Sequence, residues 1–329
     1  MPNCSRPSKR TGPHRAENAM KRNRKRMAAI SSNGWKFSWP SSSNHWKLRI
    51  DFEFLTEEVK LKATELVVMF AVIAMTTRSE MGAPVPPGAA ALGYTKCVIN
   101  ETPTADDVAS GRSGNFKWFS GQWYSTTTPT LDHYETQDGV LALKLDGDLV
   151  SAPLDFSKGK LPLLSGADGF YVEFDVRLSD NDQDHWPAVW LMPAEHDGKH
   201  DIYEGDPPRF ERFMELDVDE GGFGPGLVGT VHSTAGLYPN WKHIQNPNNV
   251  SKIPIDRSQK HTFGASYDPK QQKATWWLDG REQMSAGAPY VPAVAARQHF
   301  YLLISAQTHG RKKSYLTYVS GVRAYVPPN

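Results

Sequence analysis

From about residue 94 onward, apolar and polar residues alternate in short segments that are separated by Gly, Pro, Asp and Asn. The clearest case is residues 170–178, FYVEFDVRL, in which every second residue is apolar. A period of two predicts a strand with one buried and one exposed face. Residues 300–304, FYLLI, are apolar throughout, which predicts a strand buried on both faces.

Turn signals separate these segments. Asp138-Gly139 precedes residues 140–145, VLALKL, and Asp279-Gly280 follows residues 274–278, ATWWL. Asp-Gly between two such segments is a strong hairpin signal. We see no long segment of helical period and no fixed repeat in this region. Many short strands with turns between them predict an antiparallel sandwich or barrel, and the missing repeat disfavours a propeller.

The first 58 residues lack sustained periodicity and are rich in Ser, Asn, Arg and Lys. Residues 1–30 hold nine basic residues against Glu17 alone, a net charge of +8, while the rest of the 329-residue chain carries −7. We expect a disordered basic head, or an artefact of the assigned start site. A nucleic-acid-binding arm is the alternative, but the mildly acidic body has no basic stripe, so we expect no nucleic-acid partner.

Residues 59–80 contain a short hydrophobic run at 66–75, LVVMFAVIAM, with Lys60 and Lys62 before it. Ten apolar residues are too few to span a bilayer, which takes roughly 20. The length suits the apolar part of an export signal, although such signals begin a chain. A signal-anchor and a short amphipathic helix are the alternatives. We therefore expect a secreted, periplasmic or extracellular protein, with membrane anchoring as the second option, and we expect residues 81–93 to be a flexible linker.

Four acidic residues fall in the segment 213–220, FMELDVDE, on an expected strand. Strict alternation would place Glu215, Asp217 and Asp219 on one face and the intervening apolar residues in the core. Like charges on one face repel, so stability alone does not explain them. An exposed acidic edge strand and a calcium site are the non-catalytic alternatives. Retaining glycoside hydrolysis, in contrast, needs two carboxyl groups about 5–5.5 Å apart, one as nucleophile and one as acid/base.

This segment resembles the Glu-x-Asp-x-x-Glu signature of glycoside hydrolase family 16, in the form found in laminarinase-, agarase- and carrageenase-type members. The shorter Glu-x-Asp-x-Glu form lacks one residue, so the longer form implies a β-bulge that turns Glu220 onto the face of Glu215 and Asp217. The resemblance implies that Glu215 is the nucleophile, Asp217 the assisting carboxylate and Glu220 the acid/base. Asp219 then points elsewhere, and it is a rival acid only if no bulge forms.

Further segments resemble the family in the same order along the chain, over most of residues 95–329: 169–177, 185–193, 229–232, 261–263 with 277–280, and 316–326. For residues 94–329 the resemblance implies an antiparallel β-jelly-roll sandwich, of the concanavalin A-like kind, with an open cleft on the concave face. Two segments depart from the family. Residues 194–209 form a long polar connection, expected near the cleft, and residues 221–226 replace a short aromatic continuation.

Several residues are candidates for binding a sugar. Trp190 and Trp186 could stack on the apolar face of a pyranose, and Trp118 could be a further platform, with core filling as the alternative for each. By its place in the family pattern, His232 lies beside the nucleophile, where it could bond Glu215 or a sugar hydroxyl. Gln307 ends a buried run and could reach the cleft.

The sequence predicts neither a metal site nor a cofactor. Cys4 lies in the basic head, so we expect no structural disulfide with Cys97, and two cysteines this far apart cannot make a zinc site by themselves. His196 and His200 have the spacing of a helical metal pair, but their surroundings are loop-like. The resemblance leaves structural calcium as an alternative.

These observations predict a retaining endo-glycoside hydrolase that acts on a β-linked polysaccharide. A β-1,3-glucan is the first substrate expected, and galactans such as agar or carrageenan come next. A transglycosylase with the same residues and a lectin-like binder without activity are the alternatives. The expected partner is the polysaccharide, and we expect a monomer whose catalytic domain does not associate stably with a membrane.

Overall fold

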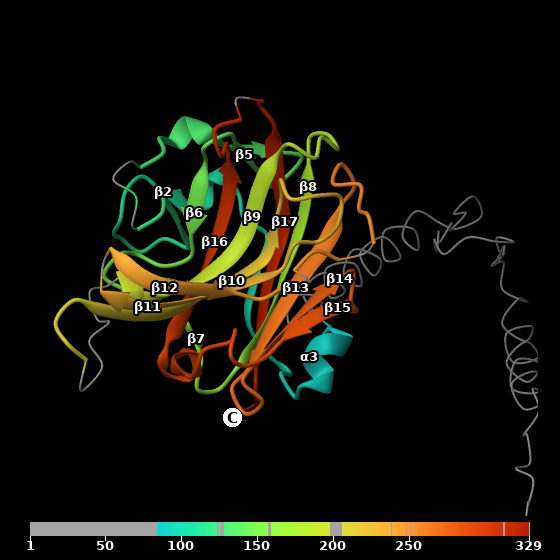
Figure 1. The fold of residues 1–329 in the computed structure, drawn as a ribbon. Coiled ribbons are helices and arrows are strands. Elements are labelled where there is room, and N and C mark those ends of the chain that lie inside the picture. Colours follow the sequence, from blue (N-terminus) through green and yellow to red (C-terminus); the bar gives the residue numbers. More distant parts are fainter. Residues whose placement is uncertain are drawn as a thin grey trace, which may run out of the picture. The chain divides into compact units, whose positions relative to one another are not determined.

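The alternating segments form the strands of two sheets, and the apolar faces of these sheets meet in a common core (Figure 1). The computed structural model describes residues 84–329 except positions 124, 126, 127, 157, 158, 198–205, 238, 248, 252, 312 and 329. All strand pairs of the two sheets are antiparallel apart from the short parallel pair β2–β3. The architecture is the predicted β-jelly-roll sandwich.

The first sheet has eight strands. Its order is β15 (Arg281–Ala286), β14 (Lys273–Leu278), β13 (His261–Asp268), β8 (Phe170–Leu178), β17 (Leu316–Val326), β5 (Val140–Lys144) and β4 (Tyr134–Gln137), and β1 (Lys96–Glu101) also pairs with β17. The turn Asp279-Gly280 joins β14 and β15 with φ values of 50° and 75°, as a tight hairpin requires. The hairpin prediction is confirmed.

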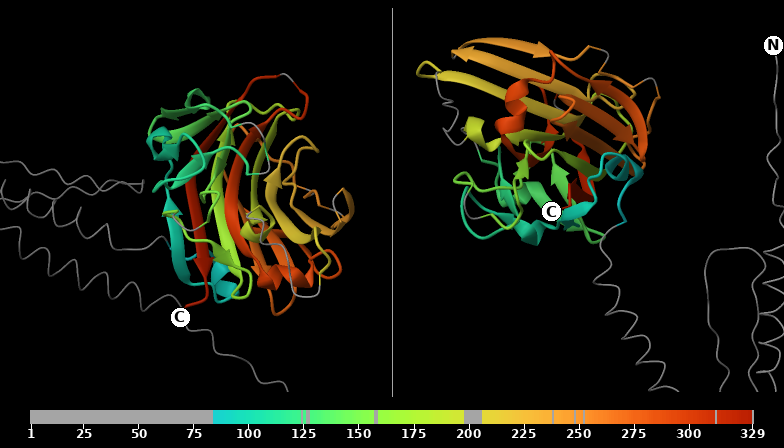
Figure 2. Two further views of the ribbon diagram at one scale, coloured as in Figure 1. Left: turned by 90° about the vertical axis from the view of Figure 1, so that its left-hand side faces the viewer. Right: turned by 90° about the horizontal axis from the view of Figure 1, so that it is seen from below.

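The second sheet has nine strands. Its order is β12 (Asn240–Gln245), β11 (Thr230–Leu237), β10 (Phe210–Glu220), β9 (Trp186–Pro193), β16 (His299–Gln307), β6 (Asp148–Val150), β3 (Trp118–Ser120) and β2 (Val108–Ala109), and β7 (Leu164–Ser165) also pairs with β16. Figure 2 shows that strands from the C-terminal part of the chain, in red, lie between strands from its middle, in green. Strand β10 itself pairs with its neighbours in sequence, β9 and β11.

Short helical segments precede the first strand or connect the later ones. They are α3 (Pro87–Ala91), α4 (Ala194–Asp197) and the 3₁₀ turns at Ala105–Asp107, Leu131–His133 and Ala293–Arg297. Helix α3 corrects the expectation of a flexible linker over residues 81–93. Its Gly88 and Ala89 are buried, and a Cβ at Gly88 would come within 2.9 Å of the Trp277 indole. The helix is held because glycine lets its backbone lie against a tryptophan of the eight-stranded sheet.

Alternation on β9 and β10 decides which side chains enter the core. Leu191 of β9 and Met214 and Leu216 of β10 lie in the core between the sheets, and each is at most 2% exposed. Phe300 to Ile304 of β16 are fully buried, as the unbroken apolar run predicts. Burial of apolar surface on this scale contributes about 25 cal/mol per Å². It therefore fixes which residues of β10 face away from the core.

The basic head and the hydrophobic run at 66–75 lie outside the described residues. Within the described part of the chain, no helix is both long enough and apolar enough to cross a bilayer.

Candidate functional site

A β-bulge interrupts the pairing of β10 with β9. Asp217 is opposite Trp190, but the next paired residue is Asp219, opposite Val189, so Val218 is the extra residue. A bulge inserts one residue and shifts the alternation that follows it. Strict alternation would have kept Asp219 on the side of Asp217. The bulge predicted from the spacing of the motif is confirmed.

The bulge places Glu220 on the same side of the sheet as Glu215 and Asp217, the side facing away from the core; we call it the carboxylate face. Glu220 is opposite Ala188 of β9, and Glu215 is opposite His232 of β11. Glu215 and Glu220 are half-buried, whereas Asp217 is only 4% exposed. The two glutamates share one face and are not sealed from solvent.

His232 is the positive partner of these carboxylates. Its Nε2 lies 3.1 Å from Oδ2 of Asp217, and its Nδ1 lies 2.7 Å from Nε2 of His243. Burial alone would lower the pKa of His232, but the hydrogen bond and charge of Asp217, together with the charges of Glu215 and Glu220, raise it to about 9. Burial and the charge of His232 lower the pKa of His243. We infer that the His232 imidazolium donates a hydrogen bond to a neutral His243 imidazole.

The two glutamates hold their protons more tightly than free glutamate does. Burial raises the pKa of Glu215, and the charge of Asp217 raises it further. Burial and Asp217 act on Glu220 in the same way, while the Trp186 indole, which donates to Glu220 Oε1 at 2.8 Å, acts in the opposite direction. Carboxyl groups that interact in this way titrate as a set. At neutral pH the cluster therefore retains a proton that isolated glutamates would have lost.

A tryptophan of the other sheet fixes the backbone at the bulge. Trp276 of β14 has no exposed surface, and its Nε1 donates to the main-chain oxygen of Asp217 at 2.6 Å. A Cβ at Gly229 would lie 2.4 Å from the Trp276 ring, so the glycine makes room for this indole. The sequence placed Trp276 on a strand but gave no sign that it reaches the motif.

Trp186 lies on the carboxylate face, where its indole bonds Glu220, and Gln307 shares that face because it is opposite Trp186 on β16. The ring of Trp186 stacks on His309, with centroids 4.0 Å apart, and meets the edge of Phe223 at 4.6 Å. Their role in binding a sugar stays a prediction. The sequence analysis missed His309 and Phe223, because each lies in a loop without a periodic pattern.

Trp190 and Trp118 are more enclosed than a sugar platform requires. Trp190 is 4% exposed, donates its Nε1 to Ser305 Oγ at 3.1 Å, and packs in a hydrophobic cluster with Tyr301 and Phe213. This burial leaves little ring surface for stacking. Trp118 has no exposed surface and belongs to the core between the sheets. The expectation for Trp118 is wrong, because an isolated tryptophan pattern does not reveal which face of its strand is covered.

The described residues contain one group that could hold a metal ion. Ligand atoms of Glu215, Asp217 and His232 lie within 4.8 Å of one another, in the same cluster as the predicted catalytic carboxylates. The polar connection 194–209 begins with helix α4, where His196 stacks on Phe213 at 3.9 Å. His200 lies outside the described residues, so the histidine pair is not tested.

The raised pKa values predict that the folded protein loses stability as the pH rises from about 4.5 to about 9. In this range the folded state binds more protons than the unfolded state, first at the two glutamates and then at His232. The free energy of unfolding therefore falls by about 1–2 kcal/mol over this pH range. Urea unfolding at several pH values measures it. Glu215→Gln should flatten the slope, and Glu282→Gln, an exposed change on β15, should not; equal slopes for all three proteins would contradict the prediction.

No protein-family profile matches the chain. Over 185 residues it is 27% identical to the endo-1,3-1,4-beta-glycanase ExsH of Rhizobium meliloti (strain 1021). The match covers 54% of this chain and 35% of that protein, so the chain spans about a third of the length of this relative.

Solved structures with a similar fold include two polysaccharide-degrading enzymes. The catalytic domain of an endo-1,3-beta-glucanase (laminarinase) from Thermotoga petrophila RKU-1 is 15% identical, with a TM-score of 0.45 over 71% of this chain and 98% of that chain. The beta-porphyranase BpGH16B from Bacteroides plebeius is 14% identical, with a TM-score of 0.45 over 65% of this chain and 86% of that chain. In the spacing of its carboxylates, in the bulge that gathers them and in its jelly-roll sandwich, the chain resembles glycoside hydrolase family 16.

Proposed function

We propose that the protein is a retaining endo-glycoside hydrolase that cleaves a β-linked polysaccharide by double displacement. One observation carries the proposal: the bulge on β10 brings Glu215, Asp217 and Glu220 to one solvent-accessible side of the sheet. Retaining hydrolysis needs a nucleophile and an acid/base about 5–5.5 Å apart, and two carboxyl groups can come that close only when they share a face. The name of the curated relative, an endo-1,3-1,4-beta-glycanase, supports the same class of reaction.

In the first step, protonated Glu220 gives its proton to the leaving glycosidic oxygen while Glu215 attacks the anomeric carbon. Glu215 must be ionised for this, and the His232 imidazolium favours that form. Esterification of Glu215 then removes a negative charge from the cluster. The pKa of Glu220 falls as a result, and Glu220 can now take a proton from the water that releases the glycosyl-enzyme.

Trp186 orients the carboxyl group of Glu220 through a hydrogen bond. The Trp186 indole donates to Oε1 of Glu220, which leaves the other carboxyl oxygen to carry the transferable proton. Asp217 lies between the two glutamates in sequence, and its Oδ2 lies 3.1 Å from Nε2 of His232. We propose that Asp217 holds the imidazolium in place beside the two glutamates.

We propose a β-1,3-glucan as the substrate, with galactans such as agar or carrageenan as the next candidates. The purified protein should be incubated with laminarin, lichenan, agarose and carrageenan, and the reducing ends counted. Internal cleavage of one of them, with β-configured products by NMR, supports the proposal. Longer products that form only when an acceptor sugar is added would indicate a transglycosylase, and binding without any cleavage would indicate a lectin-like protein.

We further propose that the protein is exported and that it acts as a monomer. The hydrophobic run at 66–75 has the length of the apolar part of an export signal. N-terminal sequencing of the natural protein tests this: a mature chain that retains the run would contradict cleavage there. Sedimentation of the purified protein gives the oligomeric state.

Replacing His232 should move the pH optimum upward. His232→Gln removes the cation that lowers the pKa of Glu215 and Glu220, so Glu215 ionises at higher pH and the acidic limb of the kcat/KM profile should rise by about one pH unit. His243→Gln is the matched control, since His243 has a lowered pKa and is neutral near pH 7. An unchanged profile in His232→Gln would remove the imidazolium from the mechanism.

A further inference from the structure

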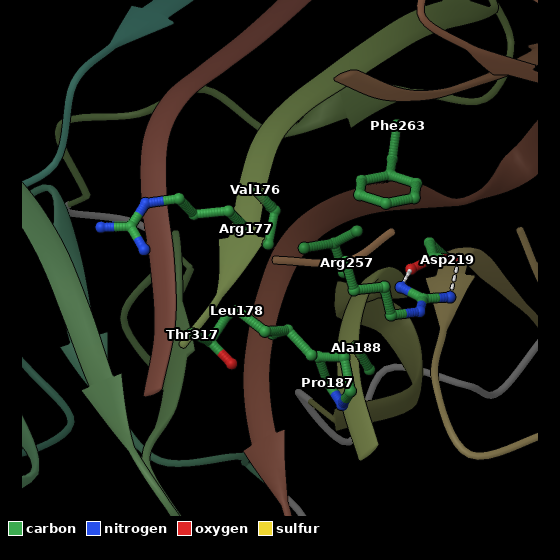
Figure 3. A pocket seen from close by; sticks show the side chains of 10 residues that line it. Val176, Arg177, Leu178, Pro187, Ala188, Asp219, Arg257, Phe263 and Thr317 are labelled. Atoms are coloured by element: carbon green, nitrogen blue, oxygen red, sulfur yellow. Dashed lines mark hydrogen bonds and ion pairs between the residues drawn. The ribbon is translucent and has the colours of Figure 1, made fainter. Parts of the chain in front are cut away.

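A buried ion pair lies directly behind the bulge, on the core side of the sheet (Figure 3). Asp219 is 3% exposed and Arg257 is 7% exposed. Arg257 Nη2 donates to Asp219 Oδ1 at 2.9 Å, and Nη1 donates to the other carboxylate oxygen. Two charges are removed from water only at a large cost in free energy, which good geometry must offset. The mechanism proposed above uses neither of them.

This ion pair fixes the main chain of the residue beside it. Asp219 Oδ1 accepts from the main-chain N–H of Val228 at 3.1 Å, and the main-chain N–H of Glu220 donates to the oxygen of Val228 at 3.0 Å. Arg257 Nη2 also donates to the oxygen of Gly226 at 3.2 Å. Val228 is thus bonded to two consecutive residues. Its N–H donates to the Asp219 side chain, and its carbonyl oxygen accepts from the main chain of Glu220.

Arg257 is itself anchored to the opposite sheet. Its main-chain oxygen accepts from the N–H of Leu178, the last residue of β8, at 2.7 Å, and its own N–H donates to Asn181 Oδ1 at 2.9 Å. The cavity beside the pair, bordered by Pro187 and Ala188 of β9, has a volume of about 10 Å³. That is room for about one water molecule, so the pair does not serve as a ligand site.

The ion pair lies close enough to Glu220 for the charge of Asp219 to affect its pKa. The pKa of Glu220 is raised first by burial, then by Asp217 and, more weakly, by Asp219. The groups around it that carry or can carry charge are Glu215, Asp217 and Asp219 on its own strand, His232 on β11, His309 and Arg311 around the Trp186 ring, and Arg257 behind Asp219. Because Arg257 is always protonated, the ion pair carries no net charge at any pH of interest, and only the weak effect of Asp219 reaches Glu220.

We propose that Asp219 and Arg257 are positioning residues for Glu220: they fix its main chain through Val228 and present no net charge behind it. Only the role of Glu220 as acid/base rests on the function proposed above. The coupling between the ion pair and Glu220 does not depend on that function, so this coupling and the proposed function can be tested separately.

The Trp186 indole reports the charge of Glu220 without any substrate, because its N–H donates to the carboxyl group. The full-length protein is titrated and the indole ¹H–¹⁵N resonance followed by NMR. Trp186→Phe assigns the resonance, and Glu220→Gln should remove the titration step that belongs to Glu220 and leave only that of His309, which stacks on the indole. Asp219→Asn keeps the shape and leaves the Arg257 cation uncompensated, so the midpoint should fall by about 1. The double variant Asp219→Asn/Arg257→Met presents no charge and should return it to the parent value.

Arg257→Lys tests the positioning role should Asp219→Asn fail to fold. Lysine keeps the charge but lacks the two-pronged donor, so the indole midpoint should stay while kcat on the polysaccharide falls about tenfold at constant KM. An unchanged kcat in Arg257→Lys, or an indole midpoint in Asp219→Asn equal to that of the parent, overturns the proposal. A parent protein that hydrolyses nothing but shows these indole shifts would refute the proposed function alone.

Discussion

Glu215→Gln is expected to abolish hydrolysis, with kcat on the polysaccharide falling about 10⁴-fold or more, as when an enzymatic nucleophile is removed. Glutamine keeps the shape of the side chain but cannot form the ester to the anomeric carbon. Binding of the polysaccharide should persist, because the rest of the carboxylate face is unchanged. Initial rates on the substrate found in the screen, together with affinity electrophoresis in a gel containing it, separate catalysis from binding.

Glu211→Gln is the matched control for Glu215→Gln. Glu211 lies on the same strand and, by alternation, on the same face as Glu215. Phe213 lies between the two glutamates on that face. Glu211→Gln should retain activity. A 2-fluoro glycosyl donor provides an independent check, because it slows release of the glycosyl-enzyme and should leave one sugar attached to Glu215 in a peptide map. A glutamine variant as fast as the parent, or a label on another residue, would remove Glu215 from the mechanism.

Much of the sandwich could be predicted because alternation is a local property with a physical cause. A side chain on a strand faces the core or faces away from it, so β8, β14 and the buried run of β16 are visible in the sequence. The motif resemblance predicted the bulge, and with it the side on which Glu220 lies. Alternation alone would have placed Asp219 there instead.

The remaining features depend on contacts between segments that are distant in sequence. Nothing near Arg257 indicates that it meets Asp219, 38 residues away, or that Trp276 of the other sheet bonds the Asp217 carbonyl. The prediction that Trp118 binds a sugar was wrong for a related reason. Both faces of its sheet carry apolar residues, and only the folded chain shows that Trp118 lies on the face buried between the sheets. Tertiary contacts, and not local pattern, determine these positions.

Glu220→Gln should lower kcat on the polysaccharide by about 10²–10⁴-fold, the usual contribution of a general acid/base. An alkoxide leaving group from a sugar needs a proton as the bond breaks, and glutamine has none to give. Aryl glycosides with an acidic phenol need no such proton. For them the first step should stay fast while release of the glycosyl-enzyme becomes slow, which gives a burst of phenol followed by a low steady rate.

Azide separates this role from a purely structural one. Azide attacks the glycosyl-enzyme without needing a base, so it should raise the steady rate of Glu220→Gln on an aryl glycoside and leave the parent unaffected. The product should be a β-glycosyl azide, because two inversions retain configuration. The half-buried place of Glu220 on the carboxylate face leaves a path for the small anion. Equal losses on polysaccharide and aryl glycoside, with no effect of azide, would instead mean that Glu220 holds the site together through Trp186 and does not transfer the proton.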